Sequence, residues 1–196
     1  MDSLLKKELE AAAANLDIVR RSLDSDRGSL EEACRMITAA LDLGGKVLLA
    51  GNGGSAADAQ HFAAELVGRY RRERKGLAAV ALTTDTSALT AIGNDYGFVS
   101  VFSRQIEALG REGDVFIGIS TSGNSPNVIA ALKTAAASGL RTIALTGGDG
   151  GDAAREAQLA IVFPAKETPR IQEYHSIVLH IIAAVAEERA QGGERV

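Results

Sequence analysis

The sequence predicts an α/β protein with a three-layer, doubly wound sheet of five parallel strands and two extra helices at its N-terminus. Short, almost wholly apolar β-rich runs alternate with helical segments after residue 45, which is the order of a parallel sheet buried on both faces. The 196 residues also contain no repeat, low-complexity tract or linker. We therefore expect one domain over residues 1–196, with N-terminal helices in 1–44 that pack in an oligomer and the α/β core in 45–190.

The first predicted helix carries a regular apolar stripe. Within residues 3–23 the apolar side chains alternate at spacings of four and three, at Leu5, Leu9, Ala12, Leu16, Val19 and Leu23. Such a stripe packs on another helix, either in a subunit interface or within the chain, and the sequence leaves both open. Ser29 followed by Glu32 has the form of a capping box and predicts the start of a second helix, which Gly44 and Gly45 end.

The core is predicted to alternate strands with helices. Its apolar runs are Val47–Ala50, Ala78–Leu82, Val115–Ile119, Thr142–Leu145 and Ile161–Phe163. The helical segments that follow these runs are 55–70, 87–109, 126–138, 150–157 and 170–190. Ligands of such sheets bind beyond the carboxyl ends of the strands, where the strand order reverses. The segment after each strand is therefore the place to look for a site.

Composition and charge exclude several classes of partner. The formal net charge of −4 gives no general attraction to nucleic acid or to an anionic membrane. Cys34 is the single cysteine and cannot form an internal disulfide, so the cytoplasm is the default compartment. The N-terminal residues carry charges throughout, unlike a signal peptide, and no apolar stretch approaches the ~18 residues of a membrane span. We expect a cytoplasmic protein without nucleic-acid or membrane partners.

The segments after the first four strands are rich in hydroxyls, glycines and small amides, and they are 51–55, 83–87, 120–125 and 146–149. The first matches the G-x-G-x-x-A spelling of a nucleotide fingerprint, which is weak alone, and no Gly-Lys-Ser/Thr follows it to make a P-loop. The third holds four hydroxyls in six residues before a helix that starts near Pro126. This arrangement favours a phosphate monoester over a simple serine cap at Ser125.

Two pairs of side chains indicate a metal site. His61 and Glu65 are four residues apart and share a helix face, although a solvated pair is the alternative for such a pair in isolation. Gln172 and His180 are eight residues apart, about 80° round a helix axis. His180 lies in an apolar run, where a buried imidazole often makes only one hydrogen bond. Two imidazoles, a carboxylate and an amide oxygen suit zinc, whereas His175 points elsewhere on its helix and is not counted as a ligand.

These segments resemble the SIS (sugar isomerase) domain family and, within it, the phosphoheptose isomerases. The resemblance covers nearly the whole chain and rests on Gly51–His61, Leu89–Asp95, Ser120–Ser125 and Arg170–Glu173. It implies the flavodoxin-like SIS fold and an aldose–ketose isomerase. The implied reaction converts sedoheptulose 7-phosphate to D-glycero-D-manno-heptose 7-phosphate through a cis-enediol, the first step of heptose synthesis for bacterial lipopolysaccharide and other surface glycans.

The resemblance also implies a homotetramer with active sites at subunit interfaces and one zinc ion per subunit. The implied zinc ligands are His61, Glu65, Gln172 and His180, with Glu65 as the carbon base and His180 as the partner acid/base. Substrate contacts carry over to Asn52, Gly53, Gly54, Ser55, Glu65, Asn94, Asp95, Ser120, Thr121, Ser122, Ser125 and Gln172. Glu167 stands where many members carry Asp, which bears on the shape of that loop.

Two other functions are weighed against the isomerase. The first is a non-catalytic SIS module that binds a sugar phosphate or, like one relative of the family, the replication initiator DnaA. In that relative the positions matching Glu65 and His180 carry residues that cannot do acid–base chemistry, whereas both are intact here. The second is nucleic-acid binding by the basic run Arg69–Lys75, for which a solvated loop or an interface is the favoured explanation because the run is short and contains an acid.

Overall fold

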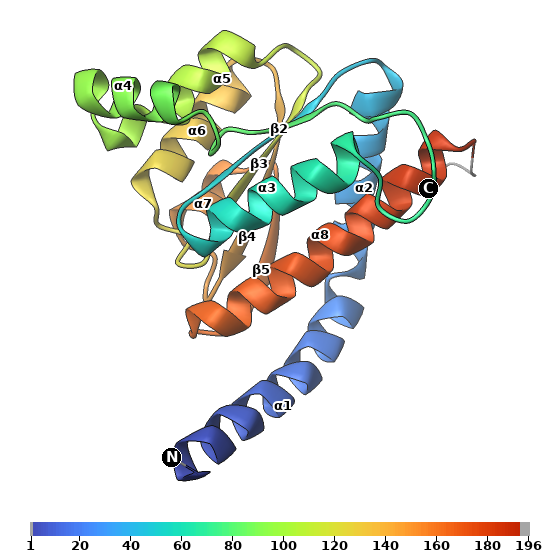
Figure 1. The fold of residues 1–196 in the computed structure, drawn as a ribbon, viewed down its shortest axis with the longest axis vertical. Coiled ribbons are helices and arrows are strands. Elements are labelled where there is room, and N and C mark those ends of the chain that lie inside the picture. Colours follow the sequence, from blue (N-terminus) through green and yellow to red (C-terminus); the bar gives the residue numbers. More distant parts are fainter. Residues whose placement is uncertain (1, 193–196) are drawn as a thin grey trace.

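The computed structural model describes residues 2–192 and confirms the predicted α/β fold. Figure 1 shows a central parallel sheet between two layers of helices, with one long helix that extends away from the body. The sheet has five strands in the order β2-β1-β3-β4-β5. The connection from β1 leads to one side of the sheet and the connection from β3 leads to the other, so the order reverses between these two neighbours.

The strands match the predicted apolar runs to within two residues. They are β1 Val47–Gly51, β2 Ala79–Ala81, β3 Val115–Ser120, β4 Arg141–Gly147 and β5 Leu159–Phe163. Every residue of β1 and β3 is buried, as expected for strands covered on both faces. The parallel register pairs Gly51 with Ile119 and Ser120 with Thr146, so the strands end at one common edge.

The two N-terminal helices are α1 Asp2–Ser25 and α2 Arg27–Asp42. The predicted capping box is wrong, because α2 begins at Arg27 and its N-cap is Asp26, without a side-chain cap bond. The Asp26 amide donates to the Ser22 carbonyl and the Leu30 amide donates to the Asp26 carbonyl, so helical bonding continues through the junction. These N–H groups are already paired and need no cap from Ser29. The predicted end is confirmed, since Gly44 follows α2 with a φ of +81°.

The apolar stripe of α1 is largely uncovered within one chain. Leu5, Leu9 and Leu16 are 60%, 62% and 66% exposed, whereas Val19, near the body of the molecule, is 6% exposed. Figure 1 shows why, because most of α1 projects beyond the layers of helices. Packing within the chain therefore accounts only for the last part of the stripe.

The remaining helices follow the strands as expected, with one break. They are α3 Gly54–Val67, α4 Thr86–Tyr96, α5 Ser103–Leu109, α6 Pro126–Ala137, α7 Gly151–Glu156 and α8 Thr168–Ala190. The single helix predicted over 87–109 is wrong, because α4 ends before Gly97, a short 3-10 turn covers Phe98–Ser100, and α5 then begins. Gly97 has a φ of +81°, which a continuous right-handed helix cannot contain.

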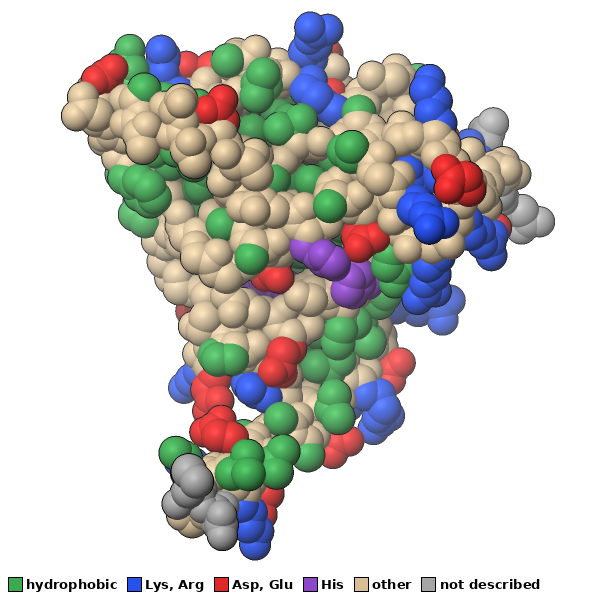
Figure 2. All heavy atoms as spheres, in the orientation of Figure 1, with side chains coloured by type: hydrophobic (Ala, Val, Ile, Leu, Met, Phe, Trp, Pro, Cys, Tyr) green, Lys and Arg blue, Asp and Glu red, His purple; other side chains and the backbone are tan. Residues whose placement is uncertain are grey.

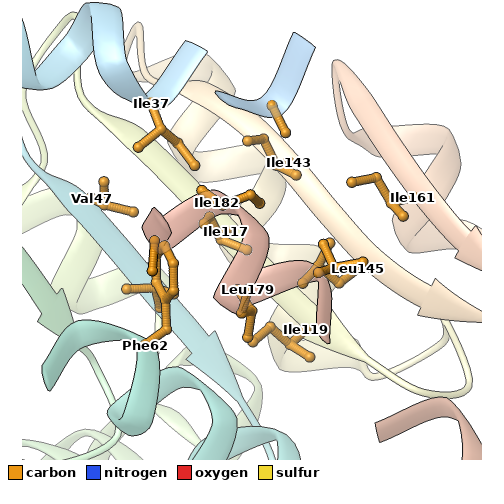
Figure 3. Close-up of a cluster of buried hydrophobic side chains, with 14 of the residues drawn as sticks. Ile37, Val47, Phe62, Ile117, Ile119, Ile143, Leu145, Ile161, Leu179 and Ile182 are labelled. Atoms are coloured by element: carbon orange, nitrogen blue, oxygen red, sulfur yellow. The ribbon is translucent and has the colours of Figure 1, made fainter. Parts of the chain in front are cut away.

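Helices cover both faces of the sheet. On the first face α2, α3 and α8 cover the strands, and Figure 3 shows Ile37, Phe62 and Leu179 from these helices around the strand residues Ile117 and Ile143. On the other face α5, α6 and α7 pack on the alternate strand residues, with α4 at the margin. The placement of α3 and α8 on the same face is what brings their polar side chains together.

Candidate functional site

The loops after β1 and β3 meet where the strand order reverses. The side-chain amides of Asn52 and Asn127 hydrogen-bond each other reciprocally, at 2.9 and 2.8 Å. Asn52 is a predicted substrate contact, whereas Asn127 was missed by the sequence analysis. A 3% exposed asparagine in the first turn of α6 is costly unless it is paired, and this pair joins the two loops into one cradle.

The glycine turn after β1 brings the start of α3 close to the strand end. A Cβ on Gly51 would lie 2.7 Å from the Ser55 carbonyl oxygen, and Gly53 has a φ of +55°. Ser55 is buried and Gly54 is exposed, so the turn presents backbone rather than bulky side chains to solvent. The predicted contacts Asn52, Gly53, Gly54 and Ser55 therefore form one continuous rim beside the neighbouring loop.

The hydroxyl-rich loop after β3 leads directly into the start of α6. Ser125 is the N-cap residue of α6 but makes no side-chain cap bond, so the simple serine cap is wrong. Its hydroxyl lies 2.9 Å from that of Ser120, and the Ser122 hydroxyl accepts the Asn124 amide at 3.2 Å. Gly123 has a φ of +66° and touches the backbone of the loop after β4. Hydroxyls grouped at a helix N-terminus suit an anion with several oxygens.

Three of the four predicted metal ligands converge between α3 and α8. The Nε2 atoms of His61 and His180 lie 2.8 Å apart, and His61 Nε2 lies 3.6 Å from a carboxylate oxygen of Glu65. Ligand atoms from all three side chains lie within 4.8 Å of one another. Figure 2 shows histidine side chains beside an acidic one at the surface over these helices.

The trio fits a divalent metal of the zinc type. Two imidazole nitrogens and a carboxylate oxygen are a common zinc donor set, with a further position open for another ligand. Nitrogens bound to one tetrahedral zinc ion are about 3.3 Å apart, so the two rings need to separate only slightly. His61 and Glu65 do pair, at 3.6 Å, with His61 half exposed, but the pair is not isolated because the His180 ring contacts His61 edge to face.

Gln172, the fourth predicted ligand, lies nearer the start of α8 than His180 and beside the start of α3. Helices α3 and α8 run in parallel, since Gln172 lies over Gly54, Ser176 donates to Asp58 at 3.0 Å, and His180 reaches His61. Two helical turns, about 12 Å, separate Gln172 from His180 along α8. Gln172 thus lies over the glycine turn, where it suits a substrate contact, and its place among the metal ligands stays a prediction.

Asp58 lies on α3, between the glycine turn and the trio, and contacts α8 through Ser176. Burial raises the pKa of its carboxyl, and this effect outweighs the Ser176 hydrogen bond and the charge of His61, which both lower it. One of its oxygens accepts the Ser176 hydroxyl and the other is buried without a partner among the described residues. Asp58 was not predicted, because the sequence of an alanine-rich helix does not distinguish a buried acid from a solvated one.

The remaining predicted contacts and the third histidine lie apart from the trio. Asn94 and Asp95 are exposed at the end of α4, where their side chains hydrogen-bond each other at 2.8 Å. Their contact with substrate stays a prediction. His175 is fully buried on the sheet side of α8, with Nε2 3.1 Å from the Thr146 carbonyl oxygen.

Comparisons with known proteins agree with this architecture. Residues 12–147 match the SIS domain family. A phosphoheptose isomerase of Aliarcobacter butzleri (strain RM4018) is 53% identical over 185 residues, which cover 94% of this chain and 96% of the relative. The structure of phosphoheptose isomerase GmhA from Neisseria gonorrhoeae superposes with a TM-score of 0.88 at 46% identity, covering 94% and 99% of the two chains. A phosphoheptose isomerase from Francisella tularensis gives a TM-score of 0.90 at 33% identity, covering 94% and 98%.

Proposed function

The chain belongs to the SIS domain family and, within it, to the phosphoheptose isomerases; from that membership we propose that it acts at the His61–Glu65–His180 trio. Its reaction is an aldose–ketose isomerisation that converts sedoheptulose 7-phosphate to D-glycero-D-manno-heptose 7-phosphate. The observation that carries the choice of site is the convergence of an acid and two imidazoles from two neighbouring helices.

The reaction moves one proton between carbons and one between oxygens. Glu65 takes the proton from C1 of the ketose, which leaves a cis-enediol, and returns it to C2. His180 supplies a proton to O2 and receives the O1 proton as the aldehyde forms. Each such transfer by a positioned side chain contributes ~10²–10⁴-fold to the rate. His180 Nε2 beside His61 and near Glu65 allows both groups to reach adjacent atoms of one substrate.

The proposed metal is zinc, held by His61, Glu65 and His180 with Gln172 as the fourth candidate. A bound zinc ion would supply Lewis-acid stabilisation of the negative charge that develops on O1 and O2. A lone pair that binds a metal is not free to take a proton, so Glu65 and His180 would hold the zinc ion in one state and transfer protons in another. His61 makes its contacts through Nε2, the atom nearest both partners.

The cradle holds the phosphate at the far end of the substrate. Ser120, Thr121, Ser122 and Ser125 and the amides that open α6 lie at the same edge of the sheet as the glycine turn. His61 lies seven residues beyond Gly54, about 10 Å along α3, so the two ends of α3 serve different parts of one extended sugar. Phosphate binding then contributes to orienting the reacting carbons.

The proposal includes a homotetramer in the cytoplasm. The exposed stripe of α1, which a second copy of the chain would cover, supports the oligomer. The single cysteine, Cys34, which is free, supports the cytoplasm. Among the described residues, no helix is long and apolar enough to cross a membrane.

The rival function is a non-catalytic SIS module that binds a sugar phosphate or the initiator DnaA. The intact trio argues against it, because a binding module needs no acid–base pair. The direct test incubates the purified protein with sedoheptulose 7-phosphate, or separately with a hexose 6-phosphate, with and without chelator. We expect aldose to form from the heptose alone and to stop on chelation. Binding without turnover would favour the rival.

A further inference from the structure

The loop from Gly68 to Gly76 links α3 to β2 and contains the basic run noted in the sequence. Its backbone is held by one carboxylate from α8. Glu187, which is 3% exposed, accepts the backbone N–H groups of Tyr70, Arg71 and Arg72 at 2.9, 2.8 and 3.0 Å. Burial alone would raise the pKa of Glu187, but these bonds and the nearby Arg74 charge outweigh it and lower the pKa. The carboxylate is thus a charged anchor for three consecutive amides.

Arg74 ties the same loop back to the end of α3. Its guanidinium donates to the carbonyl oxygens of Leu66 and Glu65 at 2.8 and 2.7 Å, which are acceptors that a helix end leaves unpaired. Its Nε lies 3.6 Å from Glu187, and both side chains are almost fully buried. The loop is therefore fixed to both helices that carry the trio.

The side chain presented by this anchored backbone is Tyr70. Its ring stacks on the His180 imidazole, with centroids 5.6 Å apart and planes inclined by 25°. The Arg71 guanidinium carbon lies 4.6 Å from the centre of the Tyr70 ring, and Arg71 Nη2 donates to the tyrosine hydroxyl at 3.1 Å. The ring also packs partly against the hydrophobic core. Tyr70 is consequently held by its backbone, its ring and its hydroxyl.

We propose that Tyr70 is a positioning residue for His180, and that Glu187 and Arg74 hold Tyr70 in place; this role rests on the proposed function. A histidine on a helix surface has several staggered side-chain conformations. The stacked Tyr70 ring and the nearly perpendicular His61 ring together hold His180 in the orientation in which Nε2 faces His61. The imidazole is then in place before metal or substrate arrives.

The same contacts explain the basic run without a nucleic-acid partner. Arg74 is buried, Arg71 lies on Tyr70, and Arg72 pairs with Glu188 at 2.5 Å. Arg69 lies 3.8 Å from Glu73 at the exposed side of the loop. Figure 2 shows basic side chains gathered beside the histidines on this face of the molecule.

The experiment compares Tyr70→Phe, which keeps the ring, with Tyr70→Ala, which removes it. The control is Arg69→Ala, in the same loop but paired only with exposed Glu73. In metal-free protein, nuclear Overhauser contacts between the imidazole protons of His180 and His61 report the orientation of His180. We expect Tyr70→Ala to lose these contacts, because His180 is then free to adopt other side-chain conformations, while the signals of His175 on the same helix serve as an unchanged internal reference. Tyr70→Phe and Arg69→Ala should retain the contacts.

Zinc affinity and kinetics provide the second and third measurements. Removal of a partner that orients a metal ligand typically costs about 10- to 100-fold in affinity or activity, and we expect this loss in Tyr70→Ala in zinc affinity and kcat, with KM nearly unchanged. Wild-type His180–His61 contacts and zinc affinity in Tyr70→Ala would overturn the proposal, as would equal damage from Tyr70→Phe. The NMR and zinc measurements need no sugar, so they decide the role of Tyr70 even if the wild-type protein fails to isomerise the heptose.

Discussion

The Nε2 atoms of His61 and His180 lie 2.8 Å apart although 119 residues separate them in the chain. This contact follows from the parallel packing of α3 on α8 over one face of the sheet. It turns two unremarkable helical histidines into neighbours, with Glu65 one turn beyond His61. The site is therefore a product of helix packing, and substitutions in it should separate chemistry from folding.

Replacement of Glu65 by glutamine should nearly abolish turnover and leave the fold and substrate binding intact. The amide cannot accept the C1 proton, so kcat should fall within the ~10²–10⁴-fold range of a lost acid–base group. Steady-state kinetics with sedoheptulose 7-phosphate measure this. Glu73→Gln, which makes the same change on an 88% exposed side chain, is the control. If Glu65→Gln keeps more than about a tenth of wild-type kcat, Glu65 is not the base.

Replacement of His180 by glutamine should lower both activity and metal retention. The variant loses a nitrogen that lies beside His61, and with it one of the converging donors. We expect a loss of activity similar to that of Glu65→Gln, together with less zinc after dialysis, measured by elemental analysis. Unchanged zinc content would remove His180 from the ligand set even if activity fell.

Gly54→Ala should impair catalysis with little cost in stability. A Cβ at this position would overlap the Gln172 amide, which is the far end of a flexible side chain and can move aside. The φ of Gly54 is not in the left-handed region, so alanine can adopt the same backbone conformation there. We expect a raised KM or lowered kcat with a melting temperature close to wild type. Gly28→Ala in α2, where a Cβ meets nothing within 4 Å, is the matched control.

The sequence was sufficient for features that depend on local pattern. Buried parallel strands require nearly continuous apolar runs, so all five strands were found, and the loops after them followed from chain direction. The break at Gly97 was missed because glycine is tolerated inside helical patterns and only its backbone angle reveals the turn. The cap at Asp26 was missed because Asp26 accepts a hydrogen bond from Tyr174, 148 residues away, which no local rule includes.

The partners of the site were less predictable than its central residues. Histidines and acids are recognisable by their chemistry, whereas Tyr70 and Glu187 act through contacts between α8 and a loop more than 100 residues away. A usable signal was present, since aromatic residues make up only 4% of the chain and one lies inside a basic run. The run looked like a solvated or interface segment because its paired acids, Glu187 and Glu188, lie in another helix.

The exposed stripe of α1 should be needed for oligomerisation. Leu9 and Leu16 lie seven residues apart on one face and are more than 60% exposed in a single chain. The double substitution Leu9→Glu with Leu16→Glu places charges where another helix would pack, so we expect a smaller oligomer by light scattering. Leu43→Glu, at an 87% exposed leucine outside α1, is the control. An unchanged mass for the double variant would move the interface away from α1.

His175 should make the protein lose stability as the pH falls below about 6.5. Burial lowers the pKa of His175 to about 4, while its hydrogen bond to the Thr146 carbonyl opposes this effect. Its Nδ1 is buried and has no partner among the described residues, so a second proton has no acceptor there. Between the two pKa values the unfolded chain binds this proton and the folded chain does not, and the free energy of unfolding therefore rises with pH in that window.

The size of this loss of stability follows from the difference between the folded and unfolded pKa values of His175. Full stability is present above the unfolded pKa of about 6.5, and near pH 5 the contribution has fallen by about 2 kcal/mol. His175→Gln keeps a donor for Thr146 but cannot titrate, so its unfolding free energy should drop less between pH 7 and pH 5 than that of the wild type. Urea unfolding at both pH values measures the free energy of unfolding of each protein. Subtracting the loss in the variant from the loss in the wild type cancels the titration of the other groups. Equal losses in the two proteins would mean that His175 is not the group responsible.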